Sequence, residues 1–167
     1  LEAIALSERP CVFSHSNPRV RANNPRNITD EQIKACAEAG GVIGVCGWGP
    51  TLWTRGAQPP SLDDFVGHIE YMVNLVGLDH VGVASDSTTS MRIDHILQHA
   101  AEVNVAYPAV TEDYVSKFGN GLDRRYPVSV AALPSVTARL LERGWKRDDV
   151  AKVMGGNFLR IWRTVWG

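Results

Sequence analysis

The sequence lacks the features that mark several classes of protein. Its 167 residues carry 17 basic and 18 acidic side chains, so the net charge is −1 and no excess of positive charge favours nucleic acid or an anionic membrane. No apolar run approaches the roughly 20 residues that span a bilayer. With 44% hydrophobic and 21% charged residues, the composition favours a globular domain without a membrane span.

Cysteine is scarce and its spacing is uninformative. Cys11, Cys36 and Cys46 form an odd number without a CxxC pair, which argues against a disulfide framework and against a zinc–thiolate site. The chain opens with LEAIALSERP, which has neither an initiator Met nor the basic start of a secretory signal. This opening is consistent with a processed or cut piece, and it leaves the compartment open between cytoplasm and periplasm.

Three short apolar runs alternate with two helical patterns. The runs lie near residues 10–15, 42–46 and 81–86, and helical periodicity is present at 28–39 and 61–76. Asn27 or Thr29 could cap the first helix, and the run Ser61-Leu-Asp-Asp caps the second. Unbroken apolar strands that alternate with helices predict an α/β fold with a parallel sheet.

Beyond the third run the pattern becomes helical, over residues 92–167. Apolar periodicity predicts helices near 92–103, 136–144, 146–154 and 157–165. The segment 47–60, rich in Gly, Trp and Pro, reads as a long loop.

Three polar residues are candidates for a functional site. His15 and Asp86 follow apolar runs, and the carboxyl ends of parallel strands carry the sites of such folds. Arg26 lies in a Pro-Arg-Asn turn. Taken singly, each residue also has a structural interpretation: a hydrogen-bonded histidine, a turn cap and a solvated loop charge.

Taken together, the motifs resemble the membrane (renal-type) dipeptidase family, zinc metallopeptidases of the amidohydrolase superfamily. The resemblance covers nearly the whole chain, with the motifs in order: Phe13-Ser-His-Ser16, Pro25-Arg-Asn, Gly40-Gly-Val-Ile-Gly44, Ser61-Leu-Asp-Asp, Gly77-Leu-Asp-His-Val-Gly-Val-Ala-Ser-Asp86, Leu140-Leu-Glu-Arg-Gly144 and Gly155-Gly-Asn-Phe-Leu-Arg160.

The resemblance implies a (β/α)₈ barrel of the TIM type, of which residues 1–167 are the C-terminal half. About three parallel strands and the C-terminal helices would belong to this half, which is incomplete alone. The family's early His-x-Asp pair, bridging glutamate and further metal histidine have no counterpart here. We therefore expect an N-terminal half, as a separate chain or a missing segment, and a homo-oligomer of the complete unit.

The resemblance also implies roles for the three candidates. His15 would bind metal, Asp86 would lie beside or ligate the metal and carry the proton, and Arg26 would hold the substrate's carboxylate. The expected reaction is hydrolysis of dipeptides, or similar small amides with a free carboxylate, with two Zn²⁺ ions per complete site. A guanidinium suits a carboxylate because it offers two parallel hydrogen bonds.

Departures from the family keep two alternatives open. Ser87-Thr-Thr-Ser90 stands where the family commonly has an aromatic residue, an acid and a glycine, and the 47–60 loop is unusual. These departures leave open a metal-dependent amidohydrolase or lactonase that acts on a non-peptide substrate. The missing metal ligands leave open a non-catalytic assembly or interaction remnant of the same barrel.

The other histidines carry weaker expectations. His95 and His99 have the i, i+4 spacing of metal ligands, but no third ligand accompanies them, so a role in a substrate loop is favoured. His68 lies on the second helix and is expected to be structural. His80 precedes the third strand, at the end of the barrel that serves stability.

Overall fold

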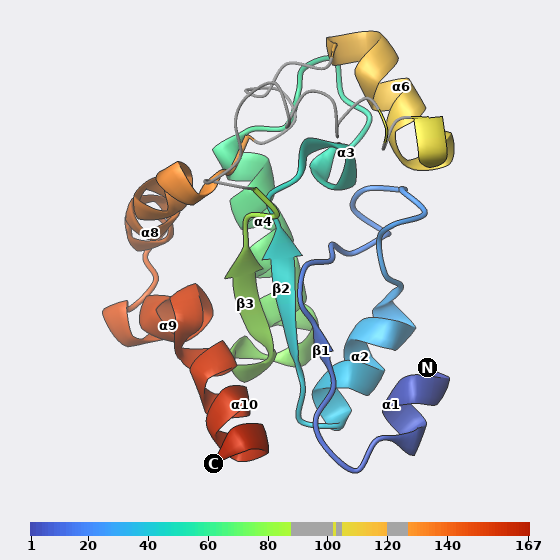
Figure 1. The fold of residues 1–167 in the computed structure, drawn as a ribbon. Helices are drawn as coiled ribbons and strands as arrows, with labels where there is room; N and C mark the ends of the chain where they lie inside the picture. The colour runs from blue at the N-terminus through green and yellow to red at the C-terminus, as the bar shows by residue number, and fades with distance from the viewer. Residues whose placement is uncertain (88–101, 103–104, 120–126) are drawn as a thin grey trace.

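The computed structural model describes residues 1–87, 102, 105–119 and 127–167 (Figure 1). Its centre is a sheet of three parallel strands in the order β1-β2-β3, formed by Val12–Phe13, Val42–Cys46 and Val81–Ala84. Val12 lies opposite Val42, and Ile43 lies opposite Val81. The structure confirms the predicted α/β class with three parallel strands, the arrangement expected of part of a (β/α)₈ barrel.

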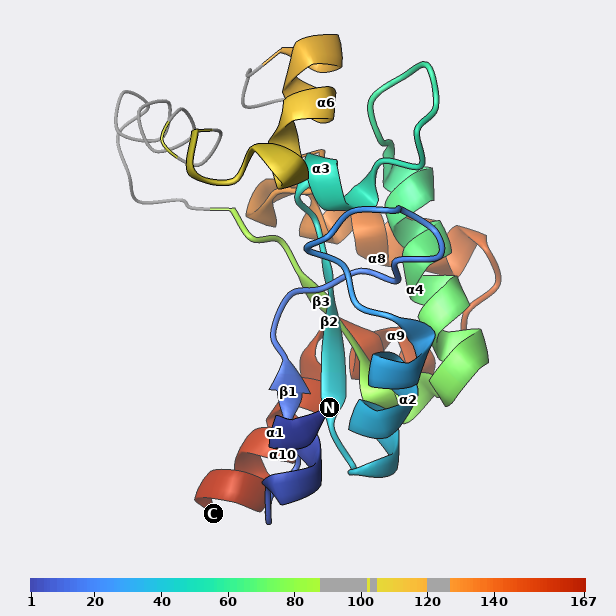
Figure 2. The same cartoon turned by 90° about the vertical axis from the view of Figure 1, so that its right-hand side faces the viewer.

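Helices surround this sheet on both faces and at both ends (Figures 1 and 2). Helices α2 and α4 pack on one face, α10 contacts β2 and β3, and α3 and α6 lie together beyond the carboxyl ends of the strands. The helices are α1 (Glu2–Leu6), α2 (Asp30–Glu38), α3 (Gly49–Leu52), α4 (Leu62–Val76), α6 (Pro108–Phe118), α8 (Leu133–Glu142), α9 (Arg147–Ala151) and α10 (Asn157–Trp166), with 3₁₀ turns at Leu78–His80 and Val130–Ala132 and a π-helical turn at Lys152–Gly156.

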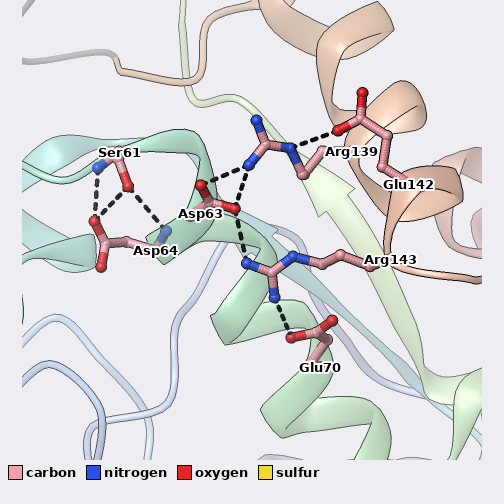
Figure 3. Close-up of polar contacts among 7 residues, drawn as sticks. All are labelled: Ser61, Asp63, Asp64, Glu70, Arg139, Glu142 and Arg143. Atoms are coloured by element: carbon pink, nitrogen blue, oxygen red, sulfur yellow. Dashed lines mark hydrogen bonds and ion pairs between the residues drawn. The ribbon is translucent and has the colours of Figure 1, made fainter.

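Two of the helices begin with reciprocal caps. Thr29 Oγ1 accepts the Gln32 N–H at 3.3 Å, while Gln32 Oε1 accepts the Thr29 N–H at 2.9 Å. Ser61 and Asp64 make the same pair of bonds at the start of α4 (Figure 3). These capping boxes satisfy N–H groups that the helix leaves free. Ser61 is the expected cap of α4, and Thr29, one of the two expected alternatives, caps α2.

The two faces of the sheet are packed differently. On one face, Ile43 and Val45 of β2 belong to a buried cluster with residues of α2 and α4. On the other face, Gly44 and Gly82 lie opposite each other, and the Phe158 ring of α10 packs against both. A Cβ on Gly82 would lie 2.8 Å from Phe158 Cδ2 and closer still to Cε2. The two glycines therefore make room for an aromatic ring.

Charged side chains join α4 to α8 (Figure 3). The Asp63 carboxylate accepts hydrogen bonds from Arg139 at 2.6 Å and from Arg143 at 2.7 Å, and Arg143 also bonds Glu70 at 2.7 Å. Arg139 reaches Glu142 on its own helix at 3.0 Å. The guanidinium of Arg143, followed by that of Arg139, lowers the pKa of Asp63. The network is solvent-exposed, so it orients α8 more than it stabilises the fold.

The structure differs from expectation at several elements. The first strand covers only Val12–Phe13, and α3 interrupts the segment that reads as a loop. Helix α6 begins with a proline at its first turn, where the missing N–H costs nothing. The helix expected near 92–103 falls almost entirely outside the described residues. Among the helices of the described residues, none has the length and apolar character needed to cross a membrane.

Candidate active site

The carboxyl edge of the sheet brings the three candidate residues together. His15 follows β1, Asp86 follows β3, and Arg26 reaches back from the loop between β1 and α2. His15 Nε2 lies 2.7 Å from Arg26 Nη2 and 3.9 Å from Asp86 Oδ1. The His15 and Asp86 side chains are 38% and 39% exposed. Residues that are distant in the chain thus form one solvent-accessible group.

The contacts of His15 define its tautomer. Arg26 is a pure donor, so the 2.7 Å contact requires Nε2 to accept. The proton then lies on Nδ1, which donates to Ser14 Oγ at 2.7 Å. A neutral imidazole whose Nδ1–H is hydrogen-bonded and whose Nε2 carries the lone pair is a form in which histidine binds metals.

Asp86 has an unusual backbone and a buried neighbour. Its φ angle is +53°, a left-handed conformation that Asp tolerates better than most residues. The Cys46 thiol, at the end of β2, lies 3.9 Å from Asp86 Oδ2. Burial and then the Asp86 carboxylate raise the pKa of Cys46 to about 12. The thiol therefore stays protonated and acts as a weak donor toward the carboxylate.

Three buried asparagines, which sequence reasoning missed, hold the loop that carries Arg26. Asn17 is 0% exposed; its Oδ1 accepts the Cys46 N–H at 2.9 Å, and its Nδ2 donates to the Cys46 carbonyl at 3.0 Å. Asn27 Nδ2 donates to the Thr51 carbonyl at 2.8 Å, and Asn24 makes similar bonds. The abundance of Asn between residues 17 and 27 was the available signal, but it does not reveal burial.

The donor set fits part of a metal site. A zinc site takes at least three protein ligands. Across the described ranges, no group of three His, Cys, Asp or Glu side chains is placed to hold a metal ion. His15 Nε2 and the Asp86 carboxylate have suitable chemistry and lie close together, so this chain offers up to two ligands from the residues described.

The remaining histidines lie away from this group. His80 Nδ1 donates to the Gly41 carbonyl at 2.9 Å, at the opposite, amino-terminal end of the sheet. His68 is fully buried on α4. Both positions agree with structural roles. His95 and His99 lie outside the described residues.

Comparison with known proteins decides the family. The model of the membrane dipeptidase family, peptidase family M19, matches residues 1–117 and 87–166. The chain belongs to the membrane dipeptidase family. The resemblance of its motifs is thereby confirmed.

The relatives that match this chain are much longer than the chain itself. Dipeptidase ataJ of Aspergillus terreus is 29% identical over 98% of the chain, which spans 33% of that protein. An uncharacterised protein in the pqqA 5′ region of Klebsiella pneumoniae is 28% identical over 94% of the chain and 47% of its own length.

Solved structures agree with the family fold. An amidohydrolase from Pseudomonas aeruginosa is 32% identical with a TM-score of 0.74, over 99% of this chain and 49% of that one. The probable dipeptidase PvdM from Pseudomonas aeruginosa is 26% identical with a TM-score of 0.68, over 96% of this chain and 46% of that one. The chain therefore spans about a third to a half of the length of these relatives.

Proposed function

We propose that the protein carrying this chain is a metal-dependent hydrolase of dipeptides, or of similar small amides with a free carboxylate. The observation that carries this proposal is the convergence of His15, Arg26 and Asp86 at the carboxyl edge of a parallel sheet. Membership of a family whose curated members include named dipeptidases supports the reaction class.

Arg26 is the proposed carboxylate-binding residue. Its side chain is exposed and lies beside His15, with Nη1 3.3 Å from Ser16 Oγ. A guanidinium can bind both oxygens of a carboxylate through two parallel charge-assisted hydrogen bonds. A free carboxylate bound there would place the neighbouring amide of a small substrate near Asp86.

Asp86 is the proposed proton carrier, and His15 is the proposed metal ligand. His15 would help to hold zinc, which when bound would supply a water of lowered pKa and polarise a carbonyl group. Asp86 would take the proton of the attacking water and pass it to the leaving amine. The Nε2 lone pair of His15 accepts one strong partner at a time, so metal binding and the Arg26 bond are alternatives.

The remaining metal ligands would come from an N-terminal half of the barrel. Residues 1–167 would form the C-terminal half. The share of the relatives that this chain spans supports that division. With ligands on both halves, neither half would hold the complete metal site, so the assembled protein is the form to assay.

The test uses the natural protein that carries this chain. We expect zinc-dependent hydrolysis of unblocked dipeptides, a lower zinc content in His15→Ala, and turnover reduced at least about a hundredfold in Asp86→Asn with KM little changed. His80→Ala is the matched control and should retain full zinc content. Normal turnover in Asp86→Asn, or full zinc content in His15→Ala, would refute the corresponding role.

A further inference from the structure

Asn24 joins three separate segments of the chain at a point two residues before Arg26. It is 6% exposed, and its amide group is fully used. Oδ1 accepts the backbone N–H of Arg26 at 2.9 Å, and Nδ2 donates to the carbonyls of Pro50 in α3 at 3.0 Å and Val110 in α6 at 2.9 Å. The peptide of Arg26 is thus tied to two elements that are distant in sequence.

A second set of contacts fixes α6 against the same loop. Arg55 forms an ion pair with Asp113 of α6 and donates to the Asn23 carbonyl at 3.5 Å. Its guanidinium lies 4.9 Å from the centre of the Trp53 ring, which meets Tyr114 of α6 edge-on with centroids 5.9 Å apart. The position of α6 relative to the loop is therefore defined by both polar and aromatic contacts.

The Arg26 side chain is exposed, whereas its backbone N–H is bonded to the buried amide of Asn24. Its guanidinium contacts Ser16 at 3.3 Å and His15 at 2.7 Å, and the side chain is exposed to solvent. Both contacts would be exchanged for a substrate carboxylate if Arg26 bound one. With those contacts exchanged, the guanidinium is positioned through its own backbone, which Asn24 anchors. Small displacements of a positioning group are costly.

We propose that Asn24 is a positioning residue that transmits the placement of α6 to Arg26 and so sets the preference for substrates with a free carboxylate. This inference rests on the proposed function, in which Arg26 holds that carboxylate. Asn24 touches no reacting atom in this scheme, so its loss should weaken carboxylate binding and leave the chemical step nearly unchanged.

The test compares a dipeptide with the same dipeptide carrying a C-terminal amide, in the natural protein. Asn24→Ala removes three hydrogen bonds, of which only one goes to Arg26. We expect the KM of the free acid to rise about two- to tenfold, the range for that one bond, with kcat nearly constant. The KM of the amide should not change. Asn24→Ser retains an acceptor for the Arg26 N–H and should recover part of the preference. Asn23→Ala, at an exposed neighbour, is the control and should match the parent protein.

Each outcome separates this role from the proposed function. A parent protein that hydrolyses neither substrate, or does not prefer the free acid, would overturn both. A parent that prefers the acid, with an Asn24→Ala variant that keeps this preference or loses kcat equally on both substrates, would overturn only the positioning role. Should Asn24→Ala fail to fold, Asp113→Ala loosens α6 from its exposed side. The same selective rise in KM is expected there, and unchanged KM values would overturn the coupling.

Discussion

His68 should make the folded protein sensitive to acid from inside its core. The residue lies on α4 with 0% exposure, and neither ring nitrogen has a hydrogen bond of normal geometry among the described residues. The pKa of His68 is lowered to about 3, mainly by burial and also by the Arg21 cation, while the Asp64 carboxylate raises it. The backbone of Leu52 is the smallest of the influences on this pKa and also raises it. The folded state therefore keeps this imidazole neutral far below the ordinary range.

The sign of the effect follows from proton counting. An unfolded chain protonates the His68 ring below about pH 6.5, whereas the folded chain does not. The unfolded state therefore binds more protons, and stability falls as the pH is lowered. Between pH 7 and pH 5 this one group should remove about 2 kcal/mol from the free energy of unfolding. The loss continues down to the folded-state pKa and then levels off.

Urea unfolding of the natural protein at pH 7 and pH 5 measures this contribution. In His68→Leu the drop between the two pH values should be about 2 kcal/mol smaller than in the parent. Asn74→Leu, at an exposed position on the same helix, changes no titratable group and should show the parent's pH dependence. An NMR titration in which His68 gains its proton near pH 6.5 in the folded protein would refute the reasoning.

Three further changes test the packing and the site. Gly82→Ala should destabilise the protein by about 1–3 kcal/mol in urea unfolding, because the new methyl overlaps the Phe158 ring; unchanged stability would contradict that packing. Asp63→Asn should lower Tm slightly at low salt and have no effect at high salt, and a salt-independent loss would argue against an electrostatic role. Arg26→Lys should raise the KM of a free-acid dipeptide about tenfold with a smaller change in kcat, because lysine lacks the guanidinium fork; equal effects on the acid and its amide would count against carboxylate binding.

Local sequence signals predicted the main helices and the central strand, because caps and apolar runs are properties of neighbouring residues. The caps at Thr29 and Ser61 and the buried strand at 42–46 were readable from residue type and spacing. The short length of β1 could not be predicted, because strand length depends on the pairing partners. The short helix α3 could not be predicted either, because it packs against α6, which is distant in the sequence. Propensity describes segments, whereas these features belong to tertiary contacts.

The polar ends of the strands were enough to predict that His15 and Asp86 lie close together, but not what holds them in place. His15 and Asp86 stand out because each ends an apolar run, whereas Asn17, Asn24 and Asn27 look like ordinary loop residues. Their roles depend on burial, which turns each amide into a set of required hydrogen bonds.

Contacts within this chain hold His15 and Asp86 at the ends of their strands. The Ser16 N–H donates to the Gly44 carbonyl at 2.8 Å, and Asn17 pairs with both backbone groups of Cys46. These bonds continue the β1–β2 pairing past the last residue of β1 and fix His15 against the end of β2. The Gly47 N–H donates to the Ala84 carbonyl at 2.8 Å and extends the β2–β3 pairing in the same way. His15 and Asp86 are therefore placed relative to each other through β2, the central strand of the described sheet.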